Sequence, residues 1–309
     1  MPRLTRRSSA RAGFTLAETL VVLVLLGIVV GTLLRVLGRQ QRFYRSANEA
    51  IDTRSQIRQA ASILPADLRS LSSVAGDFLS ITGTSIKMRA NIGSSIICNI
   101  PNATTFDVPP LNMARTTYTS WYSQPEPGDT AFLFDEGLSR GAEDDSWLKY
   151  AILSVTATTS TCTGAPYTDA GLDAGKNRYR ISVVGALTPG VTRGAVVRFS
   201  RASEYSLFQS GDRRWYLGFR DYRNNAWTTV QAVSGPYRAL QSGDGNSGVA
   251  FRYFDSTGTR ITDMSRSADV ARVDVRVRGL GEQAENQMNT RGGAFEDSLR
   301  VRVAIRNRH

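Results

Sequence analysis

Histidine and cysteine are almost absent from this chain. The single histidine is the last residue, His309, and the two cysteines are Cys98 and Cys162. Zinc sites need several cysteine or histidine ligands, and serine or cysteine nucleophiles are usually activated by a histidine. The composition therefore gives no support to a metal centre or to catalysis of these kinds. No motif marks a pair of catalytic carboxylates, so we expect no catalytic residue, no metal, no cofactor and no enzymatic activity.

Lysine is nearly as scarce. Only Lys87, Lys149 and Lys176 occur, so arginine supplies almost all of the 38 basic residues, against 27 acidic ones and a net charge of +11. Arginine binds phosphate and carboxylate with two hydrogen bonds, and a basic surface can attract nucleic acid. No recognised nucleic-acid module is visible, however. The alternating arginines near the C-terminus indicate a solvated sheet face, and we do not expect nucleic acid as a partner.

One long apolar run follows directly after a basic N-terminus. The stretch Thr19–Leu34 carries no charge, and the one acid between Phe14 and Leu34 is Glu18. An ordinary secretory signal has its small cleavage residue after the apolar run. Here the candidate, Gly13, stands before it. Cleavage after Gly13 would remove the four arginines in front and leave the apolar segment on the mature protein.

The apolar segment is long enough to cross a membrane. The 21 residues from Phe14 to Leu34 would span about 31 Å as a helix, close to the thickness of a hydrocarbon core. Basic residues flanking a membrane helix stay on the cytoplasmic side. We therefore expect a single-pass protein of the cytoplasmic (inner) membrane, in contact with lipid. Its N-terminus would be cytoplasmic, and the chain from Arg35 onwards would be extracytoplasmic.

The order Gly13, Phe14 and Glu18 in front of this run resembles the type III signal of type IV pilins and type II secretion pseudopilins. In that family a prepilin peptidase cuts after the glycine and methylates the new N-terminal residue. The glutamate at mature position five meets the N-terminal amine of a neighbouring subunit and brings it into register. The resemblance implies cleavage between Gly13 and Phe14, methylation of Phe14 and subunit registration by Glu18. It also implies partners: the prepilin peptidase, an inner-membrane assembly platform, and other major and minor pilins or pseudopilins.

Glu18 and two glycines of the segment each allow a second interpretation. A carboxylate deep in a membrane costs on the order of 3 kcal/mol, but near a helix end it can reach the interface. Glu18 could thus be a tolerated interfacial acid. Gly27 and Gly31 lie four residues apart on one helix face, where small residues let helices pack closely. Glycine is also common in membrane helices, so a packing role for the pair stays open.

The helical pattern continues beyond the membrane. Apolar residues recur at spacings of three and four from Phe43 to Leu71, with Arg54 filling one gap in the stripe. Pro65 should bend or break this helix, because proline removes a backbone hydrogen bond. The expected parts of the chain are, in order, a leader at 1–13, a transmembrane helix at 14–37, an amphipathic continuation at 38–72 and a β-rich extracytoplasmic domain at 73–309.

The residues after 72 alternate in the manner of antiparallel strands. The clearest examples are Val273–Val277 and Leu299–Ile305, where arginines alternate with apolar residues. Such strands have one buried and one solvated face. The expected fold class is α+β, with a long N-terminal helix packed on a C-terminal antiparallel domain of up to two sheets, the pilin-like arrangement. Other runs predicted as strands are 85–89, 95–98, 130–134, 149–155, 178–184, 195–200, 213–219 and 226–233.

The two cysteines admit two interpretations. Outside the cytoplasm, Cys98 and Cys162 could form a disulfide. They could equally be two separate small core residues, because sequence does not give the geometry that a disulfide requires. Sequence therefore leaves their pairing open.

The size of the chain and its C-terminal half bear on its role. Removing 13 of the 309 residues would leave 296, which is large for a major pilin. The stretch Gly248–Gly258, with strands at Ala271–Gly279 and Leu299–Asn307, resembles the C-terminal half of minor pseudopilin J and related large minor type IV pilins. This implies a structural subunit that helps to initiate a type IV pilus or type II secretion pseudopilus, or to build it near its tip. The alternative is a membrane-tethered or filament-tip binding module, an adhesin or DNA-uptake receptor.

Overall fold

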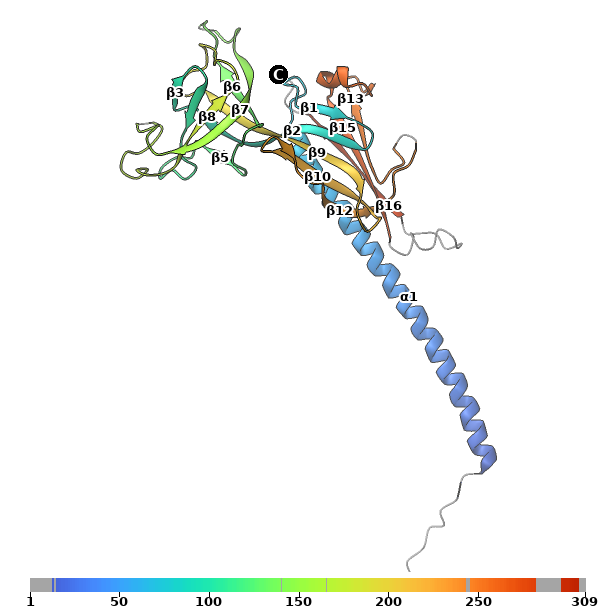
Figure 1. Cartoon of the computed structure of the whole chain (residues 1–309). Helices are drawn as coiled ribbons and strands as arrows, with labels where there is room; N and C mark the ends of the chain where they lie inside the picture. Colours follow the sequence, from blue (N-terminus) through green and yellow to red (C-terminus); the bar gives the residue numbers. More distant parts are fainter. Residues whose placement is uncertain are drawn as a thin grey trace, which may run out of the picture. The chain divides into compact units, whose positions relative to one another are not determined.

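The computed structural model describes residues 13, 15–139, 141–164, 166–242, 245–281 and 296–305. A single long helix, α1 (Leu16–Arg69), is followed by a large domain of antiparallel strands (Figure 1), which confirms the predicted α+β class. The chain divides into two compact units, Met1–Ile51 and Asp52–His309. The elements after α1 are β1 (Phe78–Ile81), β2 (Ser85–Ile96), β3 (Asn99–Asn102), β4 (Thr105–Val108), β5 (Ser120–Trp121), β6 (Thr130–Asp135), β7 (Ser146–Thr158), β8 (Arg178–Val183), β9 (Val196–Gln209), β10 (Trp215–Arg223), β11 (Ala226–Trp227), β12 (Gln231–Tyr237), β13 (Val249–Phe254), β14 (Arg260–Ile261), the 3-10 helix η1 (Met264–Asp269), β15 (Arg272–Leu280) and β16 (Glu296–Ala304).

Within the second unit, the last turns of α1 carry a buried stripe. Arg54 does not belong to it: this side chain is exposed, and its Nε lies 3.1 Å from Asp297 Oδ2. Thr53 is buried instead. Burying a neutral threonine avoids the desolvation cost that burying the Arg54 guanidinium would carry. The buried residues follow spacings of three and four, with one addition at Pro65, and are Thr53, Ile57, Ala60, Leu64, Pro65 and Leu68.

Pro65 does not break the helix, although a break is one of the two outcomes, a bend or a break, expected from the sequence. Helix α1 continues through it to Arg69, and the proline ring is buried. A proline inside a helix costs about 3 kcal/mol. Burial of Leu64 and Leu68, on the same face as the proline, gains about 1.5–3 kcal/mol for each side chain. Packing of the stripe against the sheet therefore offsets the lost hydrogen bond.

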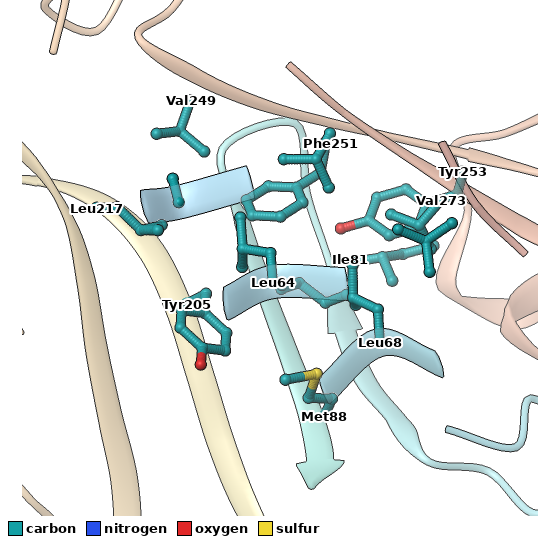
Figure 2. Close-up of a cluster of buried hydrophobic side chains, with 14 of the residues drawn as sticks. Leu64, Leu68, Ile81, Met88, Tyr205, Leu217, Val249, Phe251, Tyr253 and Val273 are labelled. Carbon is teal, nitrogen blue, oxygen red and sulfur yellow. The ribbon is translucent and has the colours of Figure 1, made fainter. Parts of the chain in front are cut away.

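The first apolar core joins this stripe to the sheet. Figure 2 shows Leu64 and Leu68 surrounded by side chains from β1, β2, β9, β10, β13 and β15. Gly279 in β15 allows the close approach, because a Cβ there would collide with Thr53 Cγ2 and would lie 3.0 Å from Ile57 Cδ1. The neighbours labelled in the figure are Ile81, Met88, Tyr205, Leu217, Val249, Phe251, Tyr253 and Val273.

A second apolar core lies further along the same strands. Strands β2 and β9 pair over Ser85–Ile96 and Val196–Ser206 and run from one core into the other. Strands β6, β7, β8 and β4 then continue the ladder in that order from β9. The strands thus form one hydrogen-bonded network with two apolar clusters. The second cluster includes Ile92, Ile97, Phe106, Val108, Ile152, Ile181, Val197 and Phe199.

Several arginines of the strands are buried rather than solvated. Arg201 in β9 is 1% exposed and holds Asp129 with two hydrogen bonds, 2.9 Å from Nε to Oδ1 and 2.7 Å from Nη2 to Oδ2. In β15, Asp274 and Arg278 are buried although both stand on the face expected to be wet. The alternation predicts which side chains share a face, but long neighbouring side chains cover part of that face.

Candidate assembly segment

The N-terminal part of α1 exposes its apolar side chains. From Leu16 to Leu37 the large apolar residues keep between 43% and 82% of their surface exposed. Within the described part of the chain this is the one helix whose length and composition would suit a membrane span, with a mean hydropathy of 2.8 over its most apolar window. Monomeric soluble proteins rarely expose so large a continuous apolar surface. Such a surface is compatible with lipid or with other helices around it.

Glu18 forms a capping box with Thr15 at the start of α1. Glu18 Oε2 accepts hydrogen bonds from Thr15 N at 3.0 Å and from Thr15 Oγ1 at 3.1 Å. In return, Glu18 N donates to Thr15 Oγ1 at 3.3 Å. This reciprocal pair satisfies backbone N–H groups that have no partner in the first turn. The sequence contains the signal for this cap, a threonine three residues before a glutamate at the start of an apolar run, although apolar periodicity does not reveal it.

Only one of the two carboxylate oxygens takes part in this cap. Both hydrogen bonds that Glu18 accepts end on Oε2. No described residue donates to Oε1, and the side chain is exposed. The first turn thus presents an acid that is held in position by Thr15 and still has an oxygen available to a donor from another molecule.

The threonines and glycines of the segment need no partner from elsewhere in the described chain and block no neighbouring helix. Thr19 Oγ1 donates to Leu16 O at 2.9 Å, and Thr32 Oγ1 donates to Val29 O at 2.7 Å, so each hydroxyl is satisfied within the helix. A Cβ added at Gly27 or at Gly31 would meet no atom within 4 Å. The face that carries both glycines is therefore open to a neighbouring helix.

The other residues singled out from sequence fall in separate places. Gly13 is exposed ahead of α1, while Phe14 and the leader before Gly13 lie outside the described residues. Cys98 and Cys162 are both buried, and the structure joins them as a disulfide with Cα atoms 5.4 Å apart. Among the residues that the structure describes, no group of three or more His, Cys, Asp or Glu side chains could hold a metal ion.

Comparison with known proteins identifies the N-terminal segment. Residues 8–34 match the model of the prokaryotic N-terminal methylation motif. No curated protein and no solved structure matches the chain. The matched residues include Gly13, Phe14, Glu18 and the exposed apolar surface as far as Leu34. Proteins with this motif are structural rather than catalytic. The chain thus carries the prokaryotic N-terminal methylation motif on a helix that could cross a membrane, which supports a type IV pilin-like family.

Proposed function

We propose that this chain is a minor pilin or pseudopilin, a structural subunit without enzymatic activity. It helps to initiate a type IV pilus or a type II secretion pseudopilus, or to build the filament near its tip. The observation that carries the proposal is the methylation motif directly in front of an uncovered apolar helix. The size of the β-sheet domain favours a minor subunit over a compact major one.

Processing would prepare the helix for assembly. The prepilin peptidase would cut after Gly13 and methylate Phe14, and the subunit would wait in the inner membrane with its β domain outside the cytoplasm. The assembly platform would then move it into a filament, where the apolar surface is covered by the helices of other pilins. The open face at Gly27 and Gly31 supports close helix packing at that stage.

The cap geometry supports a registration role for Glu18. Cleavage would leave Phe14 with a free amine that is positively charged at neutral pH. Opposite charges attract far more strongly in an apolar environment than in water. Because Thr15 occupies Oε2 of Glu18, the amine of an incoming subunit could bind Oε1 without opening the cap. Thr15 would then be a positioning residue for the acid.

The N-terminus of the protein taken from membranes tests processing. In cells with an active prepilin peptidase, we expect a chain that begins at Phe14 and is heavier by one methyl group. Gly13→Ala should block or strongly slow cleavage. A chain that still begins at Met1 under these conditions would contradict the proposal and leave residues 1–34 as a plain signal anchor.

Three substitutions separate the charge of Glu18 from its capping role. Glu18→Gln removes the charge but can still cap, because glutamine serves in capping boxes. Thr15→Ala keeps the charge and removes the hydroxyl, and Glu18→Ala removes both functions. We expect cross-linking into filaments to fall at least tenfold for Glu18→Gln and Glu18→Ala, and less for Thr15→Ala. Wild-type incorporation of Glu18→Gln would refute registration by charge and leave Glu18 as a cap.

A further inference from the structure

One face of three adjacent strands concentrates arginine. Strand β15 pairs with β13 on one side and with β16 on the other. Arg276 stands opposite Arg300 of β16, and Asp274 stands between Arg252 of β13 and Arg302 of β16. Because paired residues point to the same side of a sheet, these side chains share one face. The arginine face, as we call it, consists of Arg252, Arg272, Arg276, Arg278, Arg300 and Arg302.

Acids on this face do not balance the arginines. Asp274 and Glu296 are the acids whose positions in the strands place them on the arginine face. Six arginines and two acids give this face a net charge of +4. Asp274 is already held by Arg300 and by Arg272, whose Nε lies 3.1 Å from Oδ1. Arg276 and Arg302 are exposed, and no described residue forms an ion pair or hydrogen bond with their side chains. As far as the described residues show, both guanidinium groups are available to an anion.

Mutual repulsion is visible at the buried end of the face. Burial lowers the pKa of Arg278, and the charges of Arg276, Arg238 and Arg252 lower it further, while Glu296 acts in the opposite direction. Arg278 Nη1 donates to the backbone oxygen of Gly245, not to an acid. An anion bound over this group of arginines would relieve that repulsion.

The face also lacks the apolar centre of a typical protein interface. Interface cores are depleted in charge and enriched in aromatic residues. Here the one aromatic residue at a matching position, Phe254, is covered by the Arg272 guanidinium, whose carbon lies 4.3 Å from the ring centroid. Ala250 stands opposite Arg276 and forms part of a small recess of about 30 Å³, lined also by Arg252, Asp274 and Arg300. Charge therefore dominates what this face can recognise.

We propose that the arginine face binds the phosphate backbone of double-stranded DNA without reading its sequence. Residues two apart on a strand lie about 6.8 Å from each other and neighbouring strands about 4.8 Å apart, so several guanidinium groups can reach several phosphates together. Arginine suits this role because its planar fork matches a phosphate. A duplex is favoured over a single strand, since the described part of the face offers no uncovered aromatic ring for base stacking.

This binding needs no recognised nucleic-acid module. Contacts to phosphate supply affinity and position, whereas modules that enter a groove supply sequence specificity. The expectation from sequence that nucleic acid is not a partner rested on the absence of such a module. The arginine face does not depend on the proposed role in filament assembly, because its residues lie in β13, β15 and β16.

Fluorescence anisotropy with the full-length chain in neutral detergent and a short labelled duplex tests the proposal. With about four phosphate contacts, a plot of the logarithm of the binding constant against the logarithm of the salt concentration should have a slope near −3.6. Binding should then weaken about 100-fold between about 50 and 200 mM salt. In Arg276→Gln/Arg302→Gln the slope should fall to about −1.8, with only about 10-fold weakening over the same range. Affinity at low salt should fall by at least tenfold.

A matched variant controls for overall charge. Arg193→Gln/Arg213→Gln removes two exposed arginines outside β13, β15 and β16 and should bind DNA as the wild type does. Equal losses in the two double variants, or no binding at low salt, would overturn the proposal. Loss of self-association in Arg276→Gln/Arg302→Gln, without DNA binding by the wild type, would also overturn it and assign the face to a second copy of this chain.

Discussion

At the scale of single residues, Asp67 is a carboxylate in an unfavourable place. Its side chain is half-buried near the end of α1, and Tyr205 Oη donates to its Oδ2 at 2.7 Å. Burial raises the pKa of Asp67, and the hydrogen bond from Tyr205 only partly opposes this. A raised pKa in the folded state means that ionisation of the group costs stability. This cost is absent at low pH and appears as the pH rises through the folded-state pKa.

Asp67→Asn should therefore stabilise the protein at neutral pH. The amide oxygen can still accept the hydrogen bond from Tyr205, and no buried charge remains. We expect thermal unfolding of the full chain at pH 7 to shift upwards by a few degrees. The gain should vanish as the pH falls below the ordinary aspartate value of about 3.9. Asp145→Asn, on an exposed loop, should show no such gain. The explanation would be contradicted if both variants gained equally, or if the gain of Asp67→Asn did not change with pH.

At the scale of elements, the fit between α1 and β15 depends on one glycine. A Cβ at Gly279 would collide with Thr53 Cγ2, while the backbone of Gly279 is not in the left-handed region. Gly279→Ala should therefore act through overpacking and destabilise the domain by about 1–3 kcal/mol. For a domain of this size that corresponds to roughly 2–4 °C in Tm for each kcal/mol. Denaturant unfolding would measure the change in the free energy of unfolding, and thermal unfolding would measure the change in Tm.

A second substitution identifies the cause of that loss. Thr53→Ser removes the colliding methyl group and keeps the hydroxyl, so Thr53→Ser/Gly279→Ala should recover a large part of the stability lost by Gly279→Ala. The double-mutant cycle should give a coupling of at least about 0.5 kcal/mol. Gly211→Ala, where a Cβ would meet no atom within 4 Å, provides the control. Simple additivity of the two changes would show that the helix does not contact β15 in this way.

The sequence predicts best the elements whose apolar residues repeat regularly, and length alone is not enough: β9 has 14 residues but is predicted only over 195–200. The helix and the strands around Val275 and Val303 are predicted because their apolar residues repeat over several turns or pleats. Strand β2 appears in the sequence as two pieces, because the irregular pairing between Asn91 and Gly93 breaks the alternation while β9 holds both halves in one ladder. Strands of four residues, such as β1, β3 and β4, are too short to show a period.

At the scale of the whole molecule, no local pattern in the sequence shows which distant strands pair with one another. Strand β9 pairs with β2, with β6 and with β10, and no local pattern specifies three partners. The two cores follow from that arrangement, as does the buried pair of Arg201 and Asp129, 72 residues apart. In the N-terminal segment, by contrast, each feature depends on residues within a few turns. The methylation motif, the apolar run and the Thr15–Glu18 cap can all be read locally.

The disulfide belongs to one of the two cores, so its removal should affect them unequally. Cys98 follows Ile97 of the second cluster, and the bond to Cys162 closes a loop of 64 residues. A loop of this length restricts the unfolded chain by about 4 kcal/mol in the loop-entropy model. Reduction should therefore raise amide exchange in β4 and β8 more than in β13 and β15, measured by hydrogen–deuterium exchange and mass spectrometry. Cys98→Ser/Cys162→Ser should reproduce the reduced protein without reductant. Uniform protection before and after reduction, or two titratable thiols in the untreated protein, would show that the second core does not depend on this bond.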